Sequence, residues 1–222
     1  NAGGSAWYDI DNSELRRVGI LINADMFLYN KELRKSTFGY DNYSSVDIDP
    51  YLDFNLGGWE LRLGTRMNLI TANGANGAAF AIAPDIKLRK SFANNVSFFA
   101  KATGGRTDNN FSKLESITPY WGFDKEVSKQ LKPTYKVLDA AAGSTITFEP
   151  LSIDLAVGYV YTKDDLLQQV EYLETYSQHA FVYSNFVQKN THDAYISARV
   201  GYDYGGWLKV SGDARYDYWE CD

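Results

Sequence analysis

Apolar and polar residues alternate along this chain over segments longer than an ordinary β-strand. From Val46 to Leu56 every second residue is apolar, and the intervening residues are polar apart from Tyr51. Successive side chains of a strand point to opposite faces, so the pattern predicts a strand with one apolar and one polar face. Strands of soluble proteins usually have about 5–6 residues, whereas roughly 9–11 residues cross the hydrocarbon core of a membrane at a tilt. The alternation therefore favours strands that cross a membrane.

The same alternation recurs along most of the chain. No run of apolar residues is long enough for a transmembrane helix. We therefore predict an all-β fold, an antiparallel meander of about nine or ten long strands, within one domain over residues 1–222. The predicted strands are Val18–Leu28, Val46–Leu56, Trp59–Leu69, Ala78–Leu88, Val96–Ala102, Leu138–Phe148, Leu151–Tyr159, Ala194–Tyr202 and Leu208–Tyr218.

Short and long connections alternate between these strands. Bacterial outer-membrane barrels have short periplasmic turns and longer extracellular loops, which is the same arrangement. The predicted short turns are Gly57-Gly58, Lys90–Asn94, Glu149-Pro150 and Tyr204–Gly206. The predicted long connections are Asn30–Tyr43, Thr71–Asn76, Gly104–Thr134 and Thr162–Thr191, with weak helical periodicity at Asp164–Leu173.

Aromatic residues are abundant and often stand at the ends of the predicted strands. The chain contains 17 Tyr, 12 Phe and 5 Trp, and amphipathic rings gather where a membrane meets water. The rings at strand ends are Tyr29, Trp59, Tyr161, Trp207, Tyr218 and Trp219. We expect the chain to lie in the outer membrane of a Gram-negative bacterium, in contact with its lipid.

Composition and motifs argue against several classes of function. A net charge of −6 supplies no basic surface for nucleic acid. The single cysteine, Cys221, forms no internal disulfide and no cysteine-based zinc site. Only His179 and His192 offer imidazoles, the first in a long connection and the second on the apolar phase of its strand. Without a phosphate loop, zinc motif or nucleophile elbow, we expect no enzyme activity, no bound metal and no cofactor.

The Gly57-Gly58 turn predicts which charged residues face one another. A two-residue turn pairs Leu56 with Trp59, which places Asp53 opposite Arg62 and Asp49 opposite Arg66 on the polar face. Opposite charges that face each other across strands contribute about 0.2–1 kcal/mol each. We predict that these pairs line the lumen of a barrel as a neutralised ladder.

One long connection contains a cluster of aromatic residues, Pro119-Tyr120-Trp121-Gly122-Phe123. Rings on an external loop stack on sugar rings or on the apolar faces of ligands. Tyr120, Trp121 and Phe123 are therefore candidate contacts for a glycan or another small molecule, and the alternative is that they pack against the rim of the barrel.

The C-terminal part of the chain, Leu131 to Trp219, resembles the barrels of Bacteroidetes outer-membrane proteins of the TonB-dependent receptor type. The resemblance implies a barrel of 22 strands, plugged by a separate domain, that takes up iron chelates, cobalamin or glycans. The chain departs from it by lacking a plug, an energy-coupling box and about half of the strands. The residues that carry the resemblance are Lys132-Pro133-Thr134-Tyr135, the strand Leu151–Tyr161 with Thr162-Lys163-Asp164-Asp165, and the pair Ala194–Tyr202 and Leu208–Trp219 with its end Tyr216-Asp217-Tyr218-Trp219.

The number of strands predicts a sheet that does not close on itself. A tenth strand is available only from Ser5–Asp11, which is too short to cross a membrane, so Leu15 and Tyr218 would mark open edges. We expect the remaining strands or a plug to come from another part of the protein or from another chain. The predicted function is passage or uptake of a substrate across the outer membrane. The alternative is a soluble or surface-exposed β-sheet protein of the adhesin type that recognises a partner through its long loops.

Overall fold

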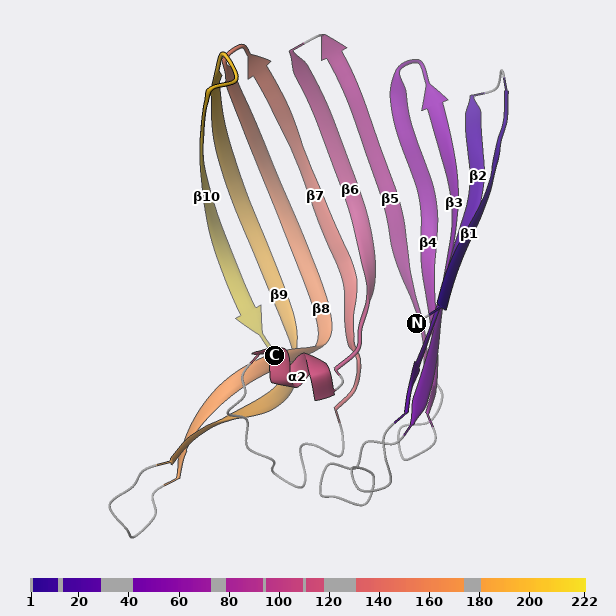
Figure 1. The fold of residues 1–222 in the computed structure, drawn as a ribbon, viewed down its shortest axis with the longest axis vertical. Coiled ribbons are helices and arrows are strands. Elements are labelled where there is room, and N and C mark those ends of the chain that lie inside the picture. The colour runs from indigo at the N-terminus through magenta and orange to yellow at the C-terminus, as the bar shows by residue number, and fades with distance from the viewer. Residues whose placement is uncertain are drawn as a thin grey trace.

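The computed structural model describes residues 2–11, 14–28, 42–72, 79–93, 95–109, 111–117, 131–173 and 181–222. Ten antiparallel strands form one sheet whose order follows the chain, which confirms the predicted all-β meander (Figure 1). The strands are β1 (Ala2–Asp9), β2 (Leu15–Phe27), β3 (Tyr43–Leu56), β4 (Trp59–Ala72), β5 (Ala79–Ala93), β6 (Val96–Thr107), β7 (Thr134–Phe148), β8 (Leu151–Leu173), β9 (Phe181–Tyr204) and β10 (Leu208–Cys221).

The two faces of the sheet differ as the alternation predicts. The apolar face carries large side chains that remain 39–57% exposed even in the middle of the strands. The buried apolar residues of the described ranges are few, so the sheet does not enclose a hydrophobic core of its own. An apolar surface of this extent requires a covering that the described residues do not supply. Examples of the exposed positions are Val18, Ile22, Leu63, Ile86, Val157 and Ile196.

The turns after β3, β7 and β9 lie at one end of the sheet, and β2, β4 and β6 end at the opposite end, where the chain leads into the long connections (Figure 1). At the β3–β4 turn, Gly57 and Gly58 have φ angles of 58° and 84°, as a type I′ turn requires. Gly205 and Gly206 adopt similar angles of 58° and 77° between β9 and β10. Leu56 pairs with Trp59, so the register that the Gly-Gly turn predicts is present.

Two of the predicted connections are wrong. Lys90–Asn94 was expected to be a turn, but β5 continues to Ala93, which pairs with Val96 at the start of β6. Thr162–Thr191 was expected to be a long connection, but β8 and β9 remain paired out to Leu173 and Phe181. This outer hairpin projects beyond the rest of the sheet (Figure 1).

The bend at the base of the outer hairpin has a local cause. The pairing of β8 with β9 shifts between Thr162 and Asp165, and Asp164 has a φ angle of 52°. A bulge of this kind twists a hairpin away from the sheet. The Asp164 carbonyl accepts hydrogen bonds from Thr134 Oγ1 at 2.8 Å and Gln188 Nε2 at 3.1 Å, which fixes the bulge against the start of β7.

The region between β6 and β7, expected as a long connection over Gly104–Thr134, contains a short helix, α2 (Phe111–Ile117). It lies at the long-connection end of the sheet (Figure 1), and its Leu114 is fully buried. Within the described ranges, no helix is long and apolar enough to span a membrane.

The edges of the sheet correct one prediction and agree with another. The sequence predicts a tenth strand only from Ser5–Asp11, too short to cross a membrane, whereas β1 begins at Ala2 and pairs along β2 from Ala2 opposite Ala24 to Asp9 opposite Arg17. The first edge is therefore β1 and not the strand that contains Leu15. Within the described residues β1 and β10 are not paired with each other, so the sheet is open as expected.

Candidate functional site

A row of residues in register crosses the polar face from the first strand to the last. Each member lies directly opposite the next, because the pairings of the nine neighbouring strand pairs connect without a break at this level. The row reads Asp9, Arg17, Asp53, Arg62, Lys87, Lys101, Ala141, Gly158, Tyr195 and Asp217. Its charges alternate over β1–β4 and then cease to alternate.

The alternating part contains one of the predicted ion pairs. Arg62 donates from Nε and Nη2 to the two carboxylate oxygens of Asp53, at 2.7 and 2.9 Å. This two-point geometry fixes the guanidinium more firmly than a single contact would. Arg66 Nε lies 3.7 Å from Asp49 Oδ2, and its Nη1 also donates to the Gly104 carbonyl at 2.9 Å. The structure brings both predicted pairs together; that they line a lumen stays a prediction.

Aromatic rings on the polar face lie over glycines of the neighbouring strand. Tyr51 lies opposite Gly19, and Tyr195 lies opposite Gly158. A Cβ atom on either glycine would overlap the facing ring. An arginine covers the same ring in both cases, with the Arg62 guanidinium carbon 4.3 Å from the centre of Tyr51 and that of Arg215 3.8 Å from the centre of Tyr195. The glycine makes room for the ring, and the ring supports the arginine.

Gly158→Ala is expected to destabilise the sheet by about 1–3 kcal/mol, because the added methyl group forces the Tyr195 ring out of its position. Arg215 then loses its aromatic support. Gly212→Ala is the matched control, since a Cβ there meets no atom of the described residues within 4 Å. The stability of both variants is measured by heating them in detergent to increasing temperatures. The folded fraction at each temperature is read from its different mobility on a gel. Equal stability of the two variants would contradict this account of the glycines.

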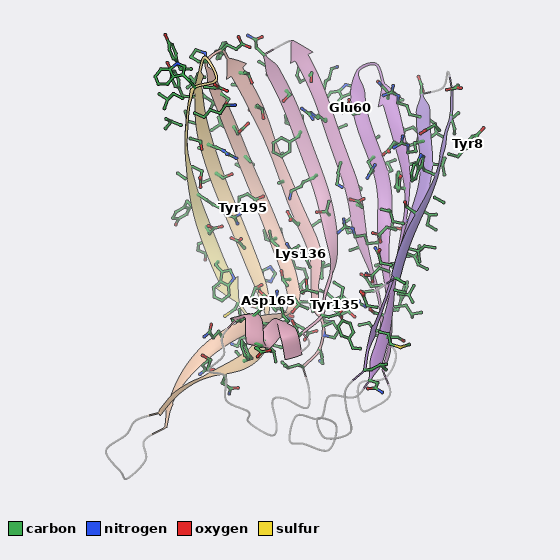
Figure 2. The ribbon with its side chains drawn as sticks, in the orientation of Figure 1. Tyr8, Glu60, Tyr135, Lys136, Asp165 and Tyr195 are labelled. Carbon is green, nitrogen blue, oxygen red and sulfur yellow. The ribbon has the colours of Figure 1, made fainter. Side chains whose placement is uncertain are left out.

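A hollow of about 550 Å³ lies on the polar face beside α2. Six elements contribute to its wall: β6, α2, β7, β8, β9 and β10. Figure 2 shows Lys136, Asp165 and Tyr195, three of the residues that line it, on neighbouring strands. Charged side chains of both signs, threonine hydroxyls and two large rings surround the hollow, so it can accept a polar solute. Its principal polar and aromatic residues are Lys101, Lys113, Lys136, Asp139, Asp165, Asp193, Tyr195, Arg215 and Trp219.

Hydrogen bonds hold the wall of this hollow. Asn109 Nδ2 donates to the Lys132 carbonyl at 2.7 Å and to Thr134 Oγ1 at 2.9 Å, which ties the segment before α2 to the start of β7. Thr191 Oγ1 donates to Asp165 Oδ2 at 2.9 Å. Arg215 Nη2 lies 2.9 Å from Asp193 Oδ2 on β9. The hollow is therefore formed by side chains that the fold has already oriented.

A second polar cluster surrounds Arg106, whose side chain is only 2% exposed. Its Nη2 lies 3.1 Å from Asp108 and 3.7 Å from Asp47, while Nε and Nη1 have no hydrogen-bond partner among the described residues. Burial raises the pKa of the Asp108 carboxyl above its ordinary value, and the Arg106 charge opposes that rise. The cluster joins the end of β6 to β3.

His192 lies on the apolar face, as its position in the alternation predicts. Its Nδ1 is 2.6 Å from the Tyr159 hydroxyl, and its ring stacks on Tyr161 with centres 4.7 Å apart. These contacts form an aromatic cluster between β8 and the middle of β9, and His192 Nε2 also lies 3.7 Å from Asp222 Oδ2. Within the described residues, no group of three or more potential metal ligands is present.

The remaining predicted site residues lie outside the described residues. These are Tyr120, Trp121 and Phe123, the candidate ligand contacts, and His179. The residues of the hollow were not predicted as a site, although Lys101 follows the polar phase of its strand. Their convergence depends on pairing across several strands, which no local pattern contains.

A two-faced meander with long strands and segregated connections is the architecture of an outer-membrane barrel wall. No family model matches the chain, and no curated protein matches it in sequence. Several solved structures do resemble it. They include the copper transporter OprC, with a TM-score of 0.61 and 12% identity over 99% of this chain and 37% of that one.

Two further structures match in the same way. The FrpB iron transporter from Neisseria meningitidis gives a TM-score of 0.59 with 13% identity, over 97% of this chain and 34% of that one. The pyoverdine outer membrane receptor FpvA from Pseudomonas aeruginosa PAO1 gives a TM-score of 0.57 with 11% identity, over 98% of this chain and 35% of that one. The chain thus spans about a third of the length of the structures that it matches.

At these identities the similarity establishes the fold. The ten-strand meander matches fragments of these outer-membrane barrels, which confirms the all-β antiparallel fold and supports, at the level of the fold, the resemblance to TonB-dependent receptor barrels. The matched structures are transporters and receptors, and none of the three is named as an enzyme. The Bacteroidetes origin stays a prediction.

Proposed function

We propose that this chain forms part of the wall of an outer-membrane transporter or receptor, with its apolar face against lipid and its polar face toward the lumen. The observation that carries the proposal is the continuous exposed apolar face, combined with a polar face of in-register charged residues. If water covered both faces of the sheet, the continuous exposed apolar face would have no explanation. The similarity to a copper transporter, an iron transporter and a pyoverdine receptor supports a role in uptake.

The open sheet supports a further part of the proposal, that other strands complete the barrel. Unpaired backbone groups of an edge strand in lipid cost several kcal/mol each, and β1 and β10 both present such edges within the described residues. The matched structures are about three times as long as this chain. We propose that the additional strands, and a plug in the lumen, belong to the same protein.

Membrane fractionation tests the location. The protein, expressed with whatever sequence flanks this segment in its gene, is expected in the outer-membrane fraction and should resist extraction by high salt and by alkaline carbonate. Detergent should release it. Recovery in the soluble fraction without detergent would contradict the proposal and favour the soluble or adhesin-type alternative.

A further inference from the structure

The charges of the row across the polar face stop alternating between β4 and β6. Arg62 lies opposite Lys87, and Lys87 lies opposite Lys101. Like charges placed directly opposite each other destabilise a sheet. Over β1–β4 the charges in the same row alternate in sign, so no like charges face each other there. The fold therefore does not require three consecutive cations on β4, β5 and β6. Their placement instead indicates a function that uses positive charge.

The acids that accompany these cations lie beneath them. Lys101 Nζ is 3.1 Å from Asp139 Oδ1, and Lys136 Nζ is 3.7 Å from Asp139 Oδ2. Two ammonium groups therefore share one carboxylate, which leaves an excess of positive charge. The Lys101 and Lys136 side chains are 36% and 49% exposed, whereas that of Asp139 is 16% exposed. A solute that approaches this wall meets the ammonium groups first.

Lys87, on the neighbouring strand β5, also lies over a more buried carboxylate, in this case one on its own strand. Its Nζ lies 3.2 Å from Asp85 Oδ1, and the two side chains are 48% and 10% exposed. Lys101 lines both the hollow beside α2 and a second hollow, toward the short-turn end, that also includes Arg62, Lys87 and Arg89. The cations thus extend from the long-connection end of the polar face toward the short-turn end.

We infer that the solute handled by this wall is an anion bearing several carboxylate or phosphate groups, bound first between Lys101 and Lys136 and passed toward Lys87 and Arg62. This inference rests on the proposed function, because it takes the polar face as the route of the solute. Tyr195 and Trp219 bound the first hollow on its far side. Arg215 already covers the Tyr195 ring, so Trp219, which is 50% exposed, provides the apolar surface for the part of the solute that carries no charge.

Equilibrium dialysis of the detergent-purified protein tests the inference with labelled citrate and pyrophosphate as anionic probes and raffinose as the neutral probe. Both anions are expected to bind in preference to raffinose, with an affinity that decreases as sodium chloride is raised. The double variant Lys101→Gln/Lys136→Gln should bind them about tenfold more weakly, as expected for the loss of contacts to charged groups. Lys209→Gln is the control, since Lys209 pairs with Asp203 next to the β9–β10 turn.

Asp139→Asn provides a test in the opposite direction. It removes the shared carboxylate and keeps both ammonium groups, so anion binding should become tighter. Unchanged anion binding in the double variant that still shows the gel shift of the folded protein, or raffinose bound as well as the anions, would overturn the inference. If neither anion binds to a protein that fractionates with the outer membrane, the solute class is wrong and the proposed location stands.

Discussion

An arginine at Ala102 is expected to prevent assembly of the sheet in a membrane, whereas an arginine at the adjacent Thr103 should be tolerated. Ala102 lies on the apolar face opposite Ile86 and Ala140, and an arginine that faces lipid near the middle of the membrane costs about 2–4 kcal/mol. Thr103 lies on the polar face between Asp85 and Asp139, which offers an added guanidinium two carboxylates. The fraction of protein that shows the gel shift of the folded form measures both variants.

Leu63→Arg extends this test to a second strand, because Leu63 is 40% exposed on the apolar face. It should resemble the Ala102 variant. If all three arginine variants assembled equally well, both faces of the sheet would be in contact with water, and the membrane assignment would fail.

A cysteine at Lys163 should react with a membrane-impermeant maleimide on intact cells, whereas one at Glu149 should react only after the outer membrane is permeabilised. Lys163 lies toward the long-connection end of β8, and Glu149 lies in the β7–β8 turn at the opposite end. The native Cys221 pairs with Thr191 near the long connections and would itself be labelled. The experiment therefore requires a Cys221→Ser background. Labelling of Glu149→Cys alone on intact cells would reverse the orientation.

The alternation predicted the faces of the strands but not all of their limits. The sequence suggests a turn at Lys90 because this lysine stands where the alternation that includes Ile86 and Leu88 calls for an apolar residue. In the structure its Nζ lies 4.7 Å from the centre of the Trp59 ring and 5.2 Å from that of Phe92, so the strand continues with its ammonium group held by aromatic faces. The outer hairpin was missed because Leu166 and Leu167 are consecutive apolar residues, which breaks the two-residue period.

Part of the candidate site could be predicted from the sequence, and part could not. Asp53 and Arg62 were predicted because a two-residue turn fixes their register by itself. The row from Arg62 to Lys101 also depends on how β5 pairs with β6. That pairing shifts between Ser91 and Ala93, and a shift of this kind has no signature in the local pattern. The charge excess around Asp139 could therefore be recognised only from the structure.

The glycines beneath aromatic rings have a consequence for the size of any passage along this wall. Three rings occupy the space that a glycine leaves open, Tyr51 at Gly19, Tyr195 at Gly158 and Phe99 at Gly143. A bulkier residue in place of a glycine would tilt the ring toward the axis of the proposed barrel and narrow its open cross-section. In the proposed barrel, residues that have no side chain would thus help to determine the width available to a solute.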